Sequence, residues 1–247
     1  MGFLKSQPGL FRARVVGFPE EPNFADDYAV ASVWGGGGTV LTDYSQLVNS
    51  EELLNVRYRV VPAGSTSPPP VYSDSRWKIY ENPRAFPRAW VVHQAIQAPS
   101  QEAALQRVTA GNLDLRRTAV VLSPPPDNLG PEPTSAETVR FDSYQANRIE
   151  LKVTTESAGL LILSDAEYPG WRATVNGRAT PILKVDGALR GIRVGVGDNR
   201  VSFAYVPVST YMGGALSALA LLWILLGRVI LGLKKPREAR SLTAAVH

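Results

Sequence analysis

Aromatic side chains next to carboxylates are the residues of this chain best suited to bind a ligand. Trp34 stands before a run of four glycines, and Asp43 and Tyr44 follow it closely. An aromatic face can stack on a sugar ring while a carboxylate accepts hydrogen bonds from the sugar hydroxyls. Aromatic residues near a turn also serve as packing. Trp34, Asp43 and Tyr44 are therefore candidate glycan-binding residues, with a packing role as the alternative.

A second aromatic pair, Tyr168 and Trp171, flanks the dipeptide Pro169-Gly170 in the segment SDAEYPGWRATVNGR. Proline and glycine together favour a tight turn, which would place Trp171 at the start of a strand and Tyr168 on the other side of the turn. Such a pair either locks the corner of a sheet or forms a platform for a ligand. Tyr168 and Trp171 complete the set of candidate glycan-binding residues, and both roles stay open.

The usual catalytic and cofactor motifs are missing from the sequence. It contains two histidines, His93 in an apolar segment and His247 at the end, and neither accompanies a nucleophile motif or a zinc-ligand spacing. Gly35 to Gly38 lack the Lys-Ser/Thr pair of a phosphate-binding loop. We therefore expect no catalytic residue, no metal site and no cofactor in this chain, and a structural role for His93.

Paired carboxylates can carry out glycoside chemistry when their separation is right. The chain has such pairs at Asp26-Asp27, at Glu51-Glu52 and at Asp165 with Glu167. Neighbouring residues on a strand point to opposite faces. We therefore interpret these acids as solvated surface charge.

The elements that would hold these residues are mostly strands. Between Val139 and Val206, apolar and polar residues alternate with the period of two that is typical of half-buried strands. Asn176-Gly177 lies between two such runs and predicts a type I′ hairpin turn. Asp186-Gly187 and Asp198-Asn199 are expected to separate the following strands. Short strands with turns between them predict an antiparallel sandwich.

The part of the chain before Val139 adds further strands and two helices. The expected strands lie at residues 11–16, 58–61, 77–80, 89–93 and 118–122, and the expected helices at 45–54 and 101–110. The last three of these strands could join the sandwich. Ser100 is placed to cap the second helix.

These patterns predict a mixed α+β fold, mainly an antiparallel β-sandwich (jelly-roll or Ig-like) with a small N-terminal α/β part and one C-terminal transmembrane helix. The expected parts are a small α/β segment at 1–62, a Pro/Ser-rich loop at 63–75, an extracytoplasmic β-sandwich at 76–207 with a Pro-rich linker at 123–135, the transmembrane helix at 208–233 and a basic cytoplasmic tail at 234–247.

The transmembrane prediction depends on the nearly apolar run from Tyr211 to Leu233. Its 23 residues would extend about 34 Å as a helix, enough for a hydrocarbon core of about 30 Å. Arg228 is the only charged residue in the run, and it lies close enough to one end for its guanidinium to reach the lipid headgroups. A buried helix of a soluble protein is the alternative.

The distribution of charge predicts the orientation of this helix. From Arg228 onward the sequence holds five basic residues and one acid, whereas residues 1–227 hold 21 of each. The positive-inside rule places the basic tail in the cytoplasm and the preceding part outside. Because that preceding part is neutral overall, binding to nucleic acid is not expected.

Two features bear on export. The chain has no cysteine, which is compatible with an exported bacterial domain. Its first residues, MGFLKSQPGLFRARVV, contain no apolar export signal. We therefore expect the chain to be the C-terminal part of a longer protein whose upstream part holds further transmembrane helices.

The segment from Ser164 to Pro207, which leads into the apolar run, resembles the C-terminal portion of the YfhO family of bacterial multi-spanning membrane proteins. The resemblance depends on the Tyr-Pro-Gly-Trp turn, the Asn-Gly hairpin, and an alternating strand that ends in an aromatic residue and a proline before the last membrane helix. It continues upstream in LLNVRYRVV and WKIYENPRAFPRAWVV.

Members of that family look like glycosyltransferases that take a sugar from a polyprenyl-phosphate carrier, with the catalytic acid in an early extracytoplasmic loop. The resemblance implies that this chain is the extracytoplasmic domain and last transmembrane helix of such a cell-envelope protein. It would cap the catalytic part or bind the acceptor glycan, without catalytic residues of its own. The implied partners are the lipid bilayer, a polyprenyl-phosphate sugar or envelope glycan, and the upstream transmembrane helices. The alternative is a single-pass, membrane-anchored β-sandwich that acts as a binding or scaffold module.

Overall fold

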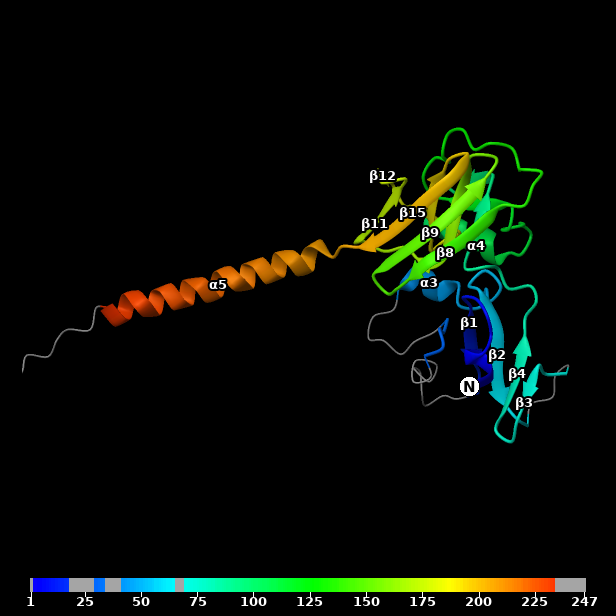
Figure 1. The fold of residues 1–247 in the computed structure, drawn as a ribbon, viewed down its shortest axis with the longest axis horizontal. Helices are drawn as coiled ribbons and strands as arrows, with labels where there is room; N and C mark the ends of the chain where they lie inside the picture. The colour runs from blue at the N-terminus through cyan, green and yellow to red at the C-terminus, as the bar shows by residue number, and fades with distance from the viewer. Residues whose placement is uncertain (1, 18–28, 34–40, 65–68, 234–247) are drawn as a thin grey trace, which may run out of the picture. The chain divides into compact units, whose positions relative to one another are not determined.

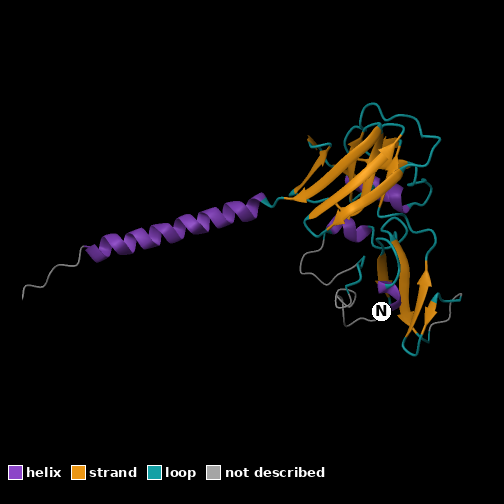
Figure 2. Cartoon of the chain, in the orientation of Figure 1, coloured by secondary structure: helices purple, strands orange, loops and turns teal. Residues whose placement is uncertain are grey.

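The computed structural model describes residues 2–17, 29–33, 41–64 and 69–233. The chain divides into two units, Met1–Tyr205 and Val206–His247, and each is described by itself. The first unit contains three sheets, and the second contains one long helix (Figures 1 and 2).

Two of the sheets form a sandwich. The six-stranded sheet has the order β5 (Ala89–Val92), β10 (Gly159–Ala166), β14 (Leu189–Val194), β13 (Leu183–Val185), β7 (Thr118–Val121) and β6 (Gln94–Gln97). The five-stranded sheet has the order β12 (Arg178–Thr180), β11 (Trp171–Val175), β15 (Gly197–Tyr205), β9 (Arg148–Thr155) and β8 (Thr138–Tyr144). All pairings within them are antiparallel except that of β6 with β7.

The alternating residues of the five-stranded sheet build the core between the two sheets. Leu151 on β9 and Phe203 on β15 are almost fully buried, and they share one apolar cluster with Leu161 on β10 and Ile192 on β14. Period-two alternation arises because one face of each strand meets the opposite sheet while the other meets solvent. The predicted antiparallel sandwich is therefore confirmed.

Strand β10 is an interior strand of the six-stranded sheet that the alternation did not predict. Residues 159–165 are buried without interruption. One of its faces joins the core against the five-stranded sheet, and the other packs with helix α4 (Gln101–Thr109). A strand buried on both faces has no polar alternation to reveal it.

Helix α4 matches its predicted position. Ser100 is its N-cap, and its side chain accepts a hydrogen bond from the backbone N–H of Ala103. Gly111 follows with φ of +70°, as expected just past a helix end. The apolar side of α4, including Leu105 and Val108, covers the six-stranded sheet.

A smaller sheet precedes the sandwich in the chain. Its order is β1 (Arg12–Val15), β2 (Val56–Pro62), β4 (Trp77–Glu81) and β3 (Tyr72–Ser73), and the short helix α1 (Gly2–Lys5) packs on it through Leu4. The strand expected at residues 77–80 exists, but its place in the sandwich was wrong. It is β4, which pairs with β2 because β2 supplies apolar partners such as Val60, opposite Ile79.

The helix expected at residues 45–54 was also wrong in extent. Helix α3 (Thr42–Gln46) is short, and turns follow it up to Asn55. Asn55 has φ of +60°, a left-handed conformation that ends this run of turns just before β2. The turns bury Leu47 and Leu54 in the core beneath the six-stranded sheet, so tertiary packing outweighs helix propensity here.

The predicted turns met different outcomes. Asn176 and Gly177 have φ of +53° and +76° between β11 and β12, as a type I′ hairpin requires. Asp186-Gly187 lies between β13 and β14. Asp198-Asn199 is not a separator but lies within β15, because the Asn199 side chain reaches back to bond the backbone of Gly195 and closes the preceding turn.

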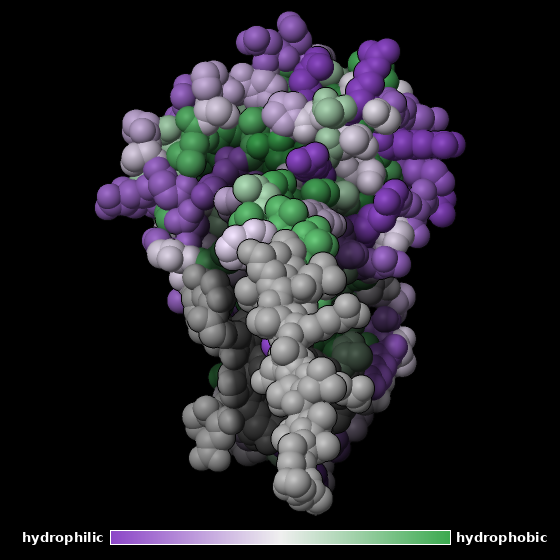
Figure 3. All heavy atoms as spheres, turned by 90° about the vertical axis from the view of Figure 1, so that its left-hand side faces the viewer, coloured by the Kyte–Doolittle hydropathy of each residue, from purple (hydrophilic) through white to green (hydrophobic). Residues whose placement is uncertain are grey.

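The second unit contains helix α5 (Val208–Leu233). Its segment from Val208 to Arg228 is long and apolar enough to cross a membrane, and it is the one such segment among the described residues. Large apolar side chains of α5, such as Leu216 and Trp223, are exposed, and Figure 3 colours the residues by hydropathy, with hydrophobic ones in green. The fold is therefore a β-sandwich with a single transmembrane helix, as predicted.

Candidate functional site

Two of the three predicted ligand-binding residues of the N-terminal part, Asp43 and Tyr44, lie on α3. Asp43 accepts a hydrogen bond from the Lys184 ammonium at 2.7 Å. Tyr44 packs against the apolar core, and burial raises the pKa of its phenol, although Arg12 and Arg88 are close enough to oppose the shift. Trp34, Gly35–Gly38 and Asp26-Asp27 lie outside the described residues.

The second predicted pair forms part of an aromatic cluster. The Tyr168 and Trp171 rings meet edge to face at 6.2 Å, and each ring also contacts Tyr205, with centroids 5.5 Å away. Gly170 has φ of +110°, and a Cβ atom at this position would lie 2.6 Å from the Tyr205 ring. Because glycine has no Cβ atom, this turn lets the start of β11 approach the end of β15 closely.

Arg190 of β14 supports this cluster from inside the sandwich. Its guanidinium carbon lies 3.6 Å from the centre of the Trp171 ring, and its Nε donates to the backbone carbonyl of Ala166 at 2.9 Å. The side chain is 4 % exposed. Burial lowers the pKa of Arg190, and the nearby Asp165 and Glu167 oppose this shift. One face of Trp171 is therefore taken by a buried cation.

A bulge in β10 brings Asp165 into the same region. The pairing with β14 shifts register between Leu163 and Ala166, which leaves Ser164 and Asp165 outside the ladder. Arg12 of β1 donates to Asp165 at 2.7 Å and to the backbone carbonyl of Ser164 at 2.6 Å. Bulges re-aim side chains in this manner. The interpretation of Asp165 as solvated surface charge was therefore wrong, because the residue is 7 % exposed and paired.

Two further groups complete the surroundings of Asp165. The Tyr144 hydroxyl lies 2.9 Å from both carboxylate oxygens, and burial, followed by the charge of Asp165, raises the pKa of Tyr144 to about 12. The Arg88 guanidinium lies 5.0 Å from the centre of the Tyr144 ring. Burial lowers the pKa of Arg88. The predicted residues Tyr44 and Trp171 thus border one buried cluster of arginines and acids, hereafter the arginine cluster (Arg12, Arg88, Arg190, Asp165 and Glu167).

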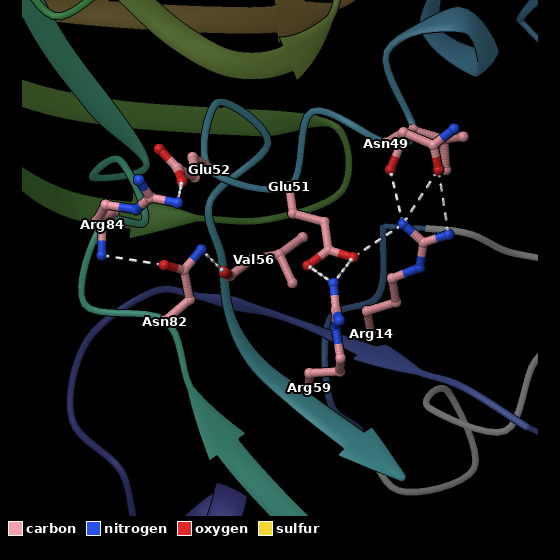
Figure 4. A network of polar contacts seen from close by, with 9 residues as sticks. Arg14, Asn49, Glu51, Glu52, Val56, Arg59, Asn82 and Arg84 are labelled. Carbon is pink, nitrogen blue, oxygen red and sulfur yellow. Dashed lines mark hydrogen bonds and ion pairs between the residues drawn. The ribbon is translucent and has the colours of Figure 1, made fainter. Parts of the chain in front are cut away.

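A groove of about 1330 Å³ lies elsewhere, between the four-stranded sheet and the loop after α4. Figure 4 shows its polar network. Glu51 accepts hydrogen bonds from Arg14 at 2.9 Å and from Arg59 at 2.8 Å, and Glu52 pairs with Arg84 at 2.8 Å. The Glu51 side chain is 14 % exposed, so its interpretation as solvated charge was also wrong.

The other wall of the groove combines an aromatic ring with polar groups. Arg116 lies over the Phe86 ring at 4.0 Å, and its Nη2 donates to the backbone carbonyl of Arg84. The hydroxyl of Tyr80 is buried and has no hydrogen-bond partner among the described residues. The charged residues that line the groove are Arg14, Arg59, Arg84 and Arg116 together with Glu51, Glu52, Glu81 and Asp114, so the lining has equal numbers of each sign.

The groove is a candidate site that the sequence patterns missed. Its lining comes from β1, the turns after α3, β2, β4 and the loop after α4. Only the fold brings these segments together, and each polar residue alone looks like ordinary surface charge. The pair Glu51-Glu52 was the one signal within it.

Metal sites and histidine chemistry receive no support within the described part of the chain. No group of three or more metal-ligating side chains occurs there. His93 lies with Nδ1 3.1 Å from the carbonyl oxygen of Ala158 and with Nε2 3.1 Å from a Glu137 carboxylate oxygen. Both ring nitrogens are engaged in fixing the segment after β7 to the sandwich, which is a structural role.

Comparison with known protein families gives a match in the second half of the chain. The model of a family described as "Bacterial membrane protein YfhO" matches residues 134–217. This range covers β8 to β15 and the beginning of α5. No curated protein and no solved structure matches the chain.

Proposed function

Because this chain belongs to the YfhO family of bacterial membrane proteins, we propose that it is the extracytoplasmic domain and last transmembrane helix of a glycosyltransferase-like protein of the cell envelope. In this proposal residues 1–207 bind the acceptor glycan and leave the chemistry to another part of the protein. The observation that carries the binding role is the groove with its balanced, hydrogen-bonding lining.

The lining suits a neutral, hydroxyl-rich ligand. A sugar presents many hydroxyl groups that both donate and accept, and carboxylates, guanidinium groups and side-chain amides offer the complementary partners. Ion pairs such as Glu51 with Arg14 hold these groups in place before a ligand arrives, which lowers the ordering cost of binding. The equal numbers of positive and negative side chains favour a neutral chain over a polyanion.

We expect the Tyr80 hydroxyl to contribute more to the free energy of glycan binding than any other single polar atom of the groove. Its hydroxyl is buried without a partner, and a buried polar group gains from a hydrogen bond with a ligand. The aromatic residues Trp34, Tyr44, Tyr168 and Trp171, with Asp43, remain candidates for a second contact with the glycan. The orientation follows the positive-inside rule, with residues 1–207 outside and the tail after Leu233 in the cytoplasm.

The test is a binding titration of the full chain in detergent with neutral oligomers of glucose and of N-acetylglucosamine. We expect saturable binding, and we expect Tyr80→Phe to raise Kd roughly two- to tenfold, the loss of one hydrogen bond. Tyr72→Phe is the matched control, because the Tyr72 hydroxyl bonds Asp74 outside the groove.

Two outcomes would contradict the proposal. If neither oligomer series nor fragments of the bacterial cell wall bind, the domain acts as a scaffold. If Tyr80→Phe and Tyr72→Phe weaken binding equally, the glycan lies elsewhere, and Trp171→Ala is the next variant to examine.

A further inference from the structure

We propose that the arginine cluster is a binding site for an oxyanion of the phosphate type, held chiefly by Arg88 and Arg190. This site is distinct from the groove, and its occupant would be either free phosphate or the phosphate of a lipid headgroup. Three independent observations support it: the convergence of the strands, the local charge and the unpaired donors.

The strands converge at one end of the six-stranded sheet. Leu163 of β10 pairs with Ala89 of β5 on one side and with Arg190 of β14 on the other. Arg88 directly precedes Ala89, and the β10 bulge follows Leu163. The side chains meet around Asp165, which bonds Arg12 and Tyr144. Arg88 lies over the Tyr144 ring, and the charge of Asp165 acts on both Arg88 and Arg190.

The charges of the cluster do not cancel. Three guanidinium groups face two carboxylates, and both oxygens of Asp165 are already engaged by Tyr144, one of them also by Arg12. Tyr44 and Tyr144 are neutral at pH 7, since the ordinary pKa of a tyrosine is 10.0 and burial raises both pKa values further. Lys184 is paired with Asp43. One positive charge thus remains uncompensated in a region where Arg88 and Arg190 are 4 % and 3 % exposed, and buried charge requires a partner.

The unpaired polar atoms are almost all donors. The buried donors of the cluster without a hydrogen-bond partner among the described residues are Nε and Nη1 of Arg88, Nη1 of Arg190 and Nε1 of Trp171. The one buried acceptor of the cluster without such a partner is Oε2 of Glu167. A phosphate group offers only acceptors when fully ionised, and a planar guanidinium binds two of its oxygens at once. The cluster therefore has more hydrogen-bond donors than acceptors and more positive than negative charge, which favours a bound anion.

The cluster reaches the surface next to the aromatic residues. Glu167, Tyr168 and Trp171 are only partly buried, so the cluster comes nearest to solvent at this edge of the sandwich. Two residues separate Tyr205, which contacts Trp171, from the first residue of α5. A lipid phosphate is therefore one source of the anion, and free phosphate is the other.

The experiment measures thermal unfolding of the full chain in a phosphate-free, uncharged detergent. One arm titrates inorganic phosphate and the other titrates a short-chain phosphatidic acid, with chloride at equal ionic strength as the reference. We expect Tm to rise with the logarithm of the phosphate concentration, as it does for any ligand of the folded state. A response to both probes indicates a free-phosphate site, and a response to the lipid alone indicates a headgroup site; both support the proposal.

Variants locate the site. We expect Arg88→Met to weaken binding about ten- to a hundredfold, the loss of a charge-assisted hydrogen bond. Arg88→Lys keeps the charge and serves if the first variant does not fold; we expect weaker binding than in the wild type. Arg178→Met, an exposed arginine on β12, is the matched control. The proposal is overturned if neither probe shifts Tm of the wild type, or if both Arg88 variants respond as the wild type does.

Discussion

At the scale of single residues, burial decides what each charged side chain does. Asp165 and Glu51 look alike in the sequence, yet one is held by Arg12 and Tyr144 and the other by two arginines of the groove. The sequence patterns singled out Tyr44 as an aromatic residue beside a carboxylate and Trp171 as one of two aromatic residues that flank a tight turn, and both border the arginine cluster. They could not indicate the partners, because Arg12 and Asp165 are 153 residues apart.

Asp186 gives a prediction for the dependence of stability on pH. Its carboxylate is fully buried, and burial raises its pKa from 3.8 to about 7, although the hydrogen bond from the Val120 N–H opposes the shift. Because the folded state holds the proton more tightly than the unfolded state, the free energy of unfolding falls as pH rises from about 4 to about 7.

The Asp186→Asn variant removes this titration. Asn also tolerates the left-handed conformation of Asp186, with φ of +49°. We therefore expect the fall in stability between pH 4 and 7 to be smaller in the variant than in the wild type, by on the order of a few kcal/mol. Denaturant unfolding across this pH range measures it, with Asp142→Asn, an exposed carboxylate, as the control. Equal slopes in both proteins would show that Asp186 does not titrate in this window.

At the scale of elements, the Pro-Gly turn determines how β11 meets β15. We expect Gly170→Ala to destabilise the domain by about 1–3 kcal/mol, because φ of +110° strains any other residue and the added methyl group meets the Tyr205 ring. Gly177→Ala is the matched control, since Gly177 also has positive φ but open space around it. Thermal unfolding of the two variants compares them, and an equal loss would show that contact with Tyr205 adds nothing.

Strands and helices with one buried and one exposed face could be predicted from the sequence. Those whose position depends on contacts with residues far away in the sequence could not. Strands β9, β11 and β15 and helix α4 appear where alternation or capping indicates them. Strand β10 has no alternation of apolar and polar residues because both of its faces are covered. Helix α3 is short, and the turns after it bury Leu47 and Leu54 in the core. The groove depends on the placement of β4, which its own residues do not determine.

At the scale of the whole molecule, the orientation in the membrane is the property most open to test. The chain has no cysteine, so single cysteines report without background. We expect Arg178→Cys to react with a membrane-impermeant maleimide added to spheroplasts, and Ser241→Cys to react only after permeabilisation, because the basic tail favours the cytoplasm. The reverse pattern would place the sandwich in the cytoplasm.

The bond between Arg12 and Asp165 also constrains the order of events during synthesis. Strand β1 is synthesised before β10, so its buried guanidinium has no carboxylate partner until the end of β10 has been made. Closing so long a loop is slow, and a domain generally docks its parts after each has formed. The N-terminal sheet therefore attaches to the sandwich as a late step, and until then the nascent chain carries an arginine that must stay in water.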